Sequence, residues 1–491
     1  MLTTWFVALA AVALLGWTLY RSLPLGKLGL LAWFQSVTLM LPWLLFFGLV
    51  SLGIYPNFVL ILLLFIGSTV LYIAIGQRLR SAGRALAAVQ QTAPAEDSSP
   101  TSDALGAAAP VTEESQAASN ELTMPAADLQ ALQGVFGIDT FFATETIPYQ
   151  GGAIVKGNLR GEPALVRQGL AERLQASLGE RYTLFLVAGT DGRPTVIVLP
   201  TERLRLPSAP TQRLFMAGLL VTTVFTCFQA AGLALGLEVT AIPGRWGTVL
   251  PLALGTLAVL GVHELGHWWM ARQRGVKLQF PFFLPAWQVG SFGAITRFRE
   301  PVPHRAALFD VAAAGPLAGG GLALVLLVLG LYLSRGGGGL PVLPQILQGS
   351  VLVGTLARVI LGAELQEVQV GLHPLVISGW VGLVITSLNL MPAGALDGGR
   401  IVQSIYGRPT ANRLTVVTLV VLALVALGNP LSLYWGILIF FLQREPERPT
   451  LEDITEPDDT RAGLGLLLLF LMLATLIPLS PSLAGRLGIG G

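Results

Sequence analysis

The sequence predicts a membrane all-α protein: a multi-pass helical bundle of about 9–10 spans, with a small α+β soluble domain inserted after the third span. Of its 491 residues, 53% are hydrophobic and only 12% are charged, whereas soluble domains carry roughly a quarter charged residues. The apolar residues also gather in runs near the ~20 residues that cross a bilayer. These observations argue against a soluble enzyme, a disordered chain and a collagen-like chain.

Apolar runs on both sides of a polar insert are the candidate spans. They cover residues 2–20, 29–54, 57–76, 213–236, 247–270, 307–333, 373–396, 411–428, 430–442 and 463–481. The apolar segment 348–362 is short and contains Arg358, so we expect a partial or interfacial helix there. The first run lacks a basic leader and is long for a signal-peptide core, which favours a retained span.

Lysine and arginine predict the orientation, because they concentrate in loops on the cytoplasmic side. They follow the first and third spans and the spans 247–270, 373–396 and 430–442, while few lie on the opposite face. One alternating path fits this distribution. It places the N-terminus outside and residues 77–212 in the cytoplasm. No Arg- and Ser-rich transit peptide is evident, which favours a bacterial cell membrane.

Composition divides the chain further. Residues 93–121 are rich in Ala, Ser, Pro and acids, and no Lys or Arg occurs from Ala85 to Val155. A stretch of low hydrophobicity with one sign of charge is typical of a flexible linker. We therefore expect these parts: N-terminal helices (1–76), flexible acidic linker (77–120), soluble α+β domain (121–206), transmembrane core (207–443), and C-terminal loop with the last span (444–491).

The soluble domain has its own pattern of helices and strands. Helical spacing covers 124–137 and 163–179, and strand-like runs cover 140–149, 151–161, 181–189 and 194–200. The last two runs flank Thr190-Asp191-Gly192-Arg193, which indicates a β-hairpin.

Ionisable residues inside the span 247–270 are the strongest indication of chemistry. The run Gly261–Met270 contains His263, Glu264 and His267, and such residues in an apolar span mark a functional site by default. Residues four apart share one helix face, so both imidazoles can bind one zinc ion while Glu264 serves as general base. Chance occurrence, or mutual hydrogen bonding without a metal, are weaker alternatives, because burying all three groups without a metal is costly.

A catalytic zinc ion usually takes three protein ligands, so a third is expected at the same membrane depth. Asp397, in the run Asn389–Arg400, ends an apolar span whose C-terminal end faces the cytoplasm in the predicted orientation. Asp397-Gly398-Gly399 could equally be an ordinary turn at a span end.

Charge and cysteine content exclude other classes. The formal net charge is +2, and no basic stripe predicts a nucleic-acid partner. The single cysteine, Cys227, lies in an apolar run and rules out a cysteine metal cluster.

The apolar segment 279–296 is too broken by proline and glycine to form a spanning helix. We expect it to re-enter the membrane as a strand-like loop and to pair with an unwound substrate by edge addition. A loop at the membrane surface that only packs against the protein is equally compatible with this composition.

Taken together, His263-Glu264-Leu265-Gly266-His267 and Leu396-Asp397-Gly398 resemble the site-2 protease family of intramembrane zinc metalloproteases. The segments Asp310–Gly319 and Gly290–Ala294 are similar to motifs of that family, and the resemblance covers roughly residues 247–405. Gly157–Glu162 resembles a signature of the ethylene-dependent gravitropism-deficient and yellow-green branch of plants and cyanobacteria. This branch makes a thylakoid membrane a second candidate location.

The resemblance implies His263, His267 and Asp397 as Zn²⁺ ligands and Glu264 as the catalytic base. It also implies substrate binding by Asn389, and we expect the same role for the loop residues Gly290, Ser291, Phe292 and Gly293. The chain leaves no room for a PDZ-like domain after the His263 helix, unlike the better-known bacterial members.

The predicted function is therefore hydrolysis of peptide bonds in membrane-anchored protein substrates near the cytoplasmic membrane face. One alternative is a catalytically silent membrane scaffold or chaperone of the same fold, which would have no need of Glu264. A second is a metal or ion transporter, which would normally show repeated halves, and the segment around His263 has no second copy.

Overall fold

The computed structural model describes residues 124–489, with short gaps at 190–191, 205–209, 238–241, 243, 338 and 444, together with scattered helical positions between 16 and 78. The chain forms two compact units, Met1–Pro110 and Val111–Gly491. The predicted spans 2–20, 29–54 and 57–76 and the predicted linker 77–120 fall mostly outside the described residues.

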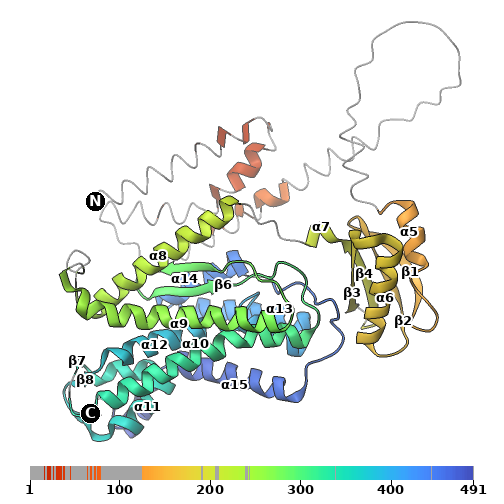
Figure 1. Cartoon of the computed structure of the whole chain (residues 1–491). Coiled ribbons are helices and arrows are strands. Elements are labelled where there is room, and N and C mark those ends of the chain that lie inside the picture. Colours follow the sequence, from red (N-terminus) through yellow and green to blue (C-terminus); the bar gives the residue numbers. More distant parts are fainter. Residues whose placement is uncertain are drawn as a thin grey trace, which may run out of the picture. The chain divides into compact units, whose positions relative to one another are not determined.

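The second unit begins with the predicted α+β domain (Figure 1). Its sheet is antiparallel in the order β1-β2-β4-β3. One face of α6 packs on the sheet through Val166, Leu170, Leu174 and Leu178, which lie four residues apart and are all buried. The elements are α5 (Ala126–Gln133), β1 (Phe141–Tyr149), β2 (Gly152–Leu159), α6 (Pro163–Leu178), β3 (Tyr182–Ala188), β4 (Pro194–Pro200) and α7 (Thr201–Leu204). The predicted hairpin is confirmed, because Ala188 pairs with Pro194.

The Gly157–Glu162 motif closes β2. A side chain at Gly157 would place its Cβ 2.3 Å from the Phe142 carbonyl oxygen, so only glycine fits there. Asn158 and Arg160 lie exposed on the surface of the domain.

A segment near the C-terminus adds to this sheet at the free edge of β3. Leu186 donates through its backbone N–H to the carbonyl of Leu451 at 2.8 Å, and Asp453 donates back to Leu186 at 2.9 Å. On its other side, the segment donates from Leu451 to Val302 at 2.8 Å. Residues 451–453, which the sequence predicts as loop, therefore join the α+β domain to the membrane helices.

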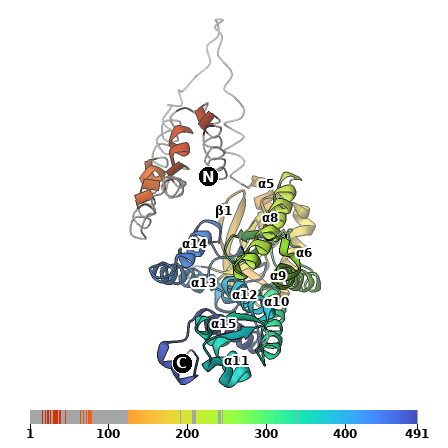
Figure 2. The same ribbon diagram turned by 90° about the vertical axis from the view of Figure 1, so that its left-hand side faces the viewer.

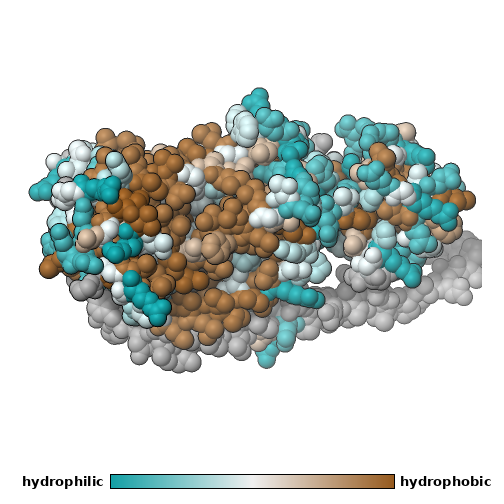
Figure 3. All heavy atoms as spheres, turned by 90° about the horizontal axis from the view of Figure 1, so that it is seen from below, coloured by the Kyte–Doolittle hydropathy of each residue, from teal (hydrophilic) through white to brown (hydrophobic). Residues whose placement is uncertain are grey.

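Five described helices are long and apolar enough to cross a membrane. They are α8 (Pro210–Ala234), α9 (Trp246–Gln273), α10 (Arg305–Leu333), α13 (Asp397–Val425) and α15 (Asp459–Leu476). Two shorter apolar helices, α12 (Pro374–Asn389) and α14 (Pro430–Leu438), accompany them, and a π-helical turn at Ile439–Gln443 continues α14. Hydrophobic side chains cover the face of these helices seen in Figure 3.

The helix α10 packs against both α9 and α12, and the three lie together in Figure 2. The remaining elements are the hairpin β5 (Phe282–Ala286) and β6 (Gly290–Ile295), the pair β7 (Leu340–Val342) and β8 (Val370–Leu372), α11 (Val351–Leu361) and α16 (Pro481–Arg486). Short 3-10 turns cover Gly179–Arg181, Pro344–Gly349 and Gly362–Gln366. The short helix expected near 348–362 is confirmed as α11.

Two predicted boundaries are wrong. The span expected at 373–396 ends at Asn389, and Asp397 begins α13 instead of ending the preceding helix. Residues 390–396 form a turn in which Gly394 has a φ of 51°. The apolar composition continues through this turn, so hydropathy alone did not mark the end of the helix. The helix α13 also starts well before the predicted 411–428 span, with a non-helical residue at Gly407.

Candidate metal centre

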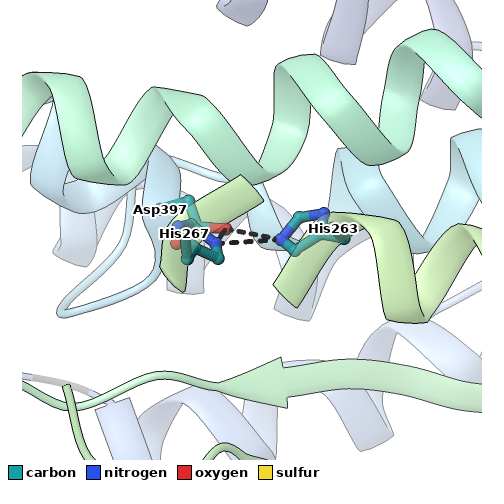
Figure 4. Close-up of side chains that lie close together, drawn as sticks. All are labelled: His263, His267 and Asp397. Atoms are coloured by element: carbon teal, nitrogen blue, oxygen red, sulfur yellow. Dashed lines mark hydrogen bonds and ion pairs between the residues drawn. The ribbon is translucent and has the colours of Figure 1, made fainter. Parts of the chain in front are cut away.

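Three side chains from two helices meet in the interior of the second unit (Figure 4). His263 and His267 lie one turn apart on α9, and Asp397 is the first residue of α13. The Nε2 atoms of the two imidazoles are 3.1 Å apart, and Oδ2 of Asp397 lies 3.1 Å from His263 and 3.3 Å from His267. All three side chains are buried.

The donor set suits zinc. Ligands at ~2.0–2.1 Å around a tetrahedral zinc ion stand about 3.3 Å from one another, close to the separations of these three atoms. Two imidazole nitrogens and one carboxylate oxygen are also ligands that zinc prefers. Among the described residues this is the group of histidine, cysteine and acidic side chains that could hold a metal ion.

A backbone carbonyl fixes the orientation of one histidine. Nδ1 of His267 lies 2.7 Å from the carbonyl oxygen of Val311 on α10. A carbonyl can only accept, so Nδ1 carries the proton and Nε2 presents its lone pair to the group. Partners of this kind orient metal-binding histidines in proteins.

Glycines on α10 allow it to approach the two histidines. A Cβ at Gly315 would lie 2.2 Å from Nε2 of His267, and a Cβ at Gly319 would lie 2.6 Å from Cβ of His263. On the facing helix, a Cβ at Gly266 would meet the carbonyl of Ala314 at 2.5 Å. The glycines of the Asp310–Gly319 motif therefore allow the two helices to pack closely.

The glycines after Asp397 play a comparable part. A Cβ at Gly398 would lie 1.8 Å from the carbonyl oxygen of Leu390, and one at Gly399 would lie 2.2 Å from that of Gly394. The start of α13 is thus packed tightly against the turn that follows α12. This close packing places Asp397 next to the two histidines as the first residue of α13, and not in a turn at the end of a span.

Glu264 lies beside the group and is partly exposed. Its Oε2 accepts a hydrogen bond from Oγ1 of Thr296 at 2.9 Å. The other carboxylate oxygen, Oε1, takes no part in this bond. Thr296 directly follows β6, and Figure 4 shows a strand of the hairpin passing the group on the side opposite α10.

The four loop residues predicted to bind substrate form the first part of β6, and all are buried. Ser291 donates to the carbonyl of Leu284 at 3.0 Å, and the ring of Phe292 stacks on Trp435 at 5.2 Å. Gly290 and Gly293 have positive φ angles of 88° and 99°. The side chains of Ser291 and Phe292 thus hold the hairpin in place and do not line an open surface.

Asn389 is also buried at the end of α12. Its Nδ2 donates to the carbonyl of Phe292 at 3.2 Å and to that of Ile385 at 3.0 Å. Asn389 therefore ties the hairpin to α12. The sequence analysis predicted that Asn389 lies near the site, but it did not indicate that its side chain bonds to backbone carbonyls.

Sequence reasoning missed a partly buried ion pair next to the group. Arg400 on α13 contacts Glu447, which follows α14, at 2.7 Å. An arginine directly after Asp397-Gly398-Gly399, at the end of an apolar run, was a usable signal, because a charge in such a place needs a partner. Nothing in the local sequence points to Glu447.

These features define a class: helical membrane proteins with a buried metal-binding group of two histidines and one aspartate, and a glutamate beside it. Two family models match the chain, the peptidase family M50 over residues 251–428 and the EGY3 middle domain over residues 130–206. The chain belongs to peptidase family M50 and to its EGY branch of zinc metalloproteases.

Plant proteins are among its relatives. The chain is 43% identical over 367 residues to the probable zinc metalloprotease EGY2, chloroplastic, of Arabidopsis thaliana, covering 73% of this chain and 66% of that protein. It is 39% identical to the EGY2 protein of Oryza sativa subsp. indica (78% and 73% covered) and 34% identical to the EGY1 protein of Arabidopsis thaliana (72% and 72% covered). No solved structure matches the chain.

Proposed function

We propose that the chain is an intramembrane zinc metalloendopeptidase that hydrolyses peptide bonds of transmembrane substrates near the cytoplasmic membrane face. One observation carries this proposal: His263, His267 and Asp397 are brought together on apolar helices with Glu264 beside them. A group of this composition is costly to bury in a membrane protein without a metal-dependent role.

Each residue then has a role. His263, His267 and Asp397 hold Zn²⁺, which supplies Lewis-acid chemistry by polarising the scissile carbonyl and making water more acidic. Glu264 takes a proton from the attacking water at the carboxylate oxygen that Thr296 does not hold. It then passes this proton to the leaving amine.

The position of the group on α9 supports a shallow site. The exposed Trp268 and Trp269 follow His267, and the guanidinium of Arg272 lies 5.1 Å from the Trp268 ring centre. Tryptophan and arginine are enriched where a span meets the aqueous phase. Water therefore has only a short path to Glu264, on the face that the charge distribution predicts to be cytoplasmic.

A substrate helix must unwind before cleavage, because its peptide groups are engaged in its own hydrogen bonds. The hairpin of β5 and β6 supports capture of the unwound segment by strand addition. Since the side chains of Ser291 and Phe292 are buried, the recognition we propose uses the hairpin backbone. The buried side chains, together with Asn389, keep that backbone in place.

We propose that the substrates are membrane-anchored proteins with a single span. The enzyme and its substrates would meet within the lipid bilayer. The predicted bacterial cell membrane finds no support among the relatives, whose names describe chloroplastic proteins. We therefore favour a thylakoid membrane, the second location predicted from the sequence. No nucleic-acid partner is expected.

The test uses the full chain in liposomes with a panel of single-span model proteins, each tagged on both sides of its span. We expect the wild type to cleave some members and Glu264→Gln to cleave none while retaining zinc. Glu172→Gln, on the soluble helix α6, is the control and should cleave like the wild type. Equal cleavage by wild type and Glu264→Gln, or no cleavage by a zinc-loaded wild type, would overturn the proposal and favour the scaffold.

A further inference from the structure

A threonine at the end of the hairpin holds the proposed base. Thr296 is buried, and its Oγ1 donates to Oε2 of Glu264 at 2.9 Å. A carboxylate that must accept a proton from water needs one oxygen directed at that water. The bond to Thr296 fixes the other oxygen and so limits rotation of the carboxylate.

The backbone of the same threonine is held by an arginine. Nη2 of Arg400 donates to the carbonyl of Thr296 at 2.6 Å, and the guanidinium lies 4.7 Å from the centre of the Phe298 ring. Arg400 is 2% exposed. It therefore links α13 to the strand end that holds Glu264.

Arg400 also faces the proposed third ligand. Its Nη1 lies 4.0 Å from Oδ1 of Asp397, whereas the other carboxylate oxygen, Oδ2, faces the two histidines. The positive charge thus lies on the side of the carboxylate away from the imidazoles. Asp397 would therefore offer Oδ2, the oxygen nearer the histidines, to a bound metal.

Glu447 completes the arrangement by balancing the buried charge. Its Oε2 accepts from Nε of Arg400 at 3.0 Å and from Nη2 at 2.7 Å. A buried guanidinium without a counter-charge is strongly unfavourable. Without Glu447, Arg400 would turn to Asp397 and compete with the metal for that carboxylate.

We propose that Thr296 and Arg400 are positioning residues of the metal centre. Thr296 orients the carboxylate of Glu264. Arg400, whose charge Glu447 neutralises, fixes the positions of Thr296 and Asp397 relative to each other. This inference rests on the proposed peptidase function and adds residues that the motifs do not include. It predicts two separable effects, one on the base and one on metal retention.

Thr296 is tested by Thr296→Val and Thr296→Ser in the full chain, with kcat and KM measured on a model substrate that the wild type cleaves. We expect Thr296→Val to lower kcat about 10–100-fold with KM and zinc content unchanged, because only the orientation of Glu264 is lost. Thr296→Ser keeps the hydroxyl and should restore kcat to within about threefold.

The matched control for this substitution is Thr475→Val. Thr475 is a buried threonine on α15 whose hydroxyl donates to the carbonyl of Leu471 in its own helix. It should keep the wild-type kcat. An unchanged kcat in Thr296→Val, or equal losses in the valine and serine variants, would overturn the role of Thr296 even if Glu264→Gln remains inactive.

The role of Arg400 is tested by the amount of zinc that the protein retains during dialysis against increasing concentrations of a chelator. This measurement does not depend on enzymatic activity. We expect Arg400→Gln and Glu447→Gln each to weaken retention about tenfold, and the double variant to be no worse than Arg400→Gln alone. Arg305→Gln removes another buried arginine, which donates to the carbonyl of Ser404, and should retain zinc like the wild type. Wild-type retention in Arg400→Gln, or additive losses in the double variant, would overturn the role of Arg400.

Discussion

His267 and Val311 are joined across two helices by a hydrogen bond of 2.7 Å between Nδ1 and a backbone carbonyl. The bond sets the tautomer of the imidazole and directs Nε2 toward His263 and Asp397. It forms only because α10 lies very close to α9, which in turn depends on glycines in the contact. The geometry of the metal site thus depends partly on the glycines in this contact.

Gly315→Ala should therefore damage the site without touching a ligand. Its new Cβ would lie 2.2 Å from Nε2 of His267, so the ring or the helix must move. We expect zinc content to fall at least tenfold, measured by metal analysis of the purified chain. Gly321→Ala on the same helix is the control, because nothing lies within 4 Å of a Cβ there. Equal zinc content in the two variants would contradict this prediction.

Removal of zinc should destabilise the fold. The proposed ligands come from α9 and α13, so a bound zinc ion would connect two helices. A free zinc concentration a thousandfold above Kd adds about 4 kcal/mol to the stability of the native state. We expect a chelator to lower the apparent Tm of the wild type and of Glu264→Gln equally. Asp397→Ala should start from a lower Tm and respond little. A chelator response in Asp397→Ala as large as in the wild type would show that the metal binds elsewhere.

His304 should make the start of α10 sensitive to acid. Its Nδ1 accepts from the backbone N–H of Ala307, which caps the helix and requires a neutral ring. Partial burial and the nearby Arg274 lower its pKa, against weaker opposing effects of Glu452 and Asp310. Because the folded pKa is lowered, the stabilisation is present above the ordinary pKa of ~6.5 and is lost as pH falls through the folded value.

The measurement for His304 is hydrogen exchange of the amides in the first turn of α10 between pH 7.5 and 5. We expect protection in the wild type to decrease with acid by at most about 1 kcal/mol, the usual worth of a cap. His304→Asn keeps an acceptor that does not titrate, so its protection should stay level. Parallel curves for the two proteins would exclude the histidine as the cause.

Asn389→Ala should loosen the hairpin. The substitution removes the donor to the carbonyl of Phe292 and leaves a buried acceptor unpaired, at a cost of about 1–3 kcal/mol. If the hairpin backbone receives the substrate, KM should rise more than kcat falls. Asn429→Ala, which removes the cap of α14, costs about 1 kcal/mol and should leave KM unchanged. A fall in kcat alone would point to a role for Asn389 in the chemical step.

The parts of the fold that the sequence predicted correctly depend on local patterns. Alternating apolar residues and the Thr190–Arg193 turn identify the sheet of the α+β domain, since strand period and turn residues lie within a few positions of each other. His263 and His267 could be paired for the same reason, because a helix brings residues four apart to one face.

Long-range pairings could not be predicted in this way. Arg400 and Glu447 are 47 residues apart, and Leu186 and Glu452, which form a parallel bridge, are much further apart. Each depends on the final packing of elements that have no mutual pattern. The end of α12 was misplaced for a different reason: Leu390 and Leu396 are buried in the turn, so burial continues where the helix does not.

The segment after α14 is anchored twice within a short distance. Glu447 is bound to Arg400 beside the metal group, and Leu451 is bound to the edge strand of the α+β domain. Four residue steps separate these anchors, and an extended chain of that length reaches roughly 14 Å. The three residues between them therefore limit the distance between the two anchors. The α+β domain can move away from Arg400 only within that distance, unless residues 451–453 separate from β3 or Glu447 separates from Arg400.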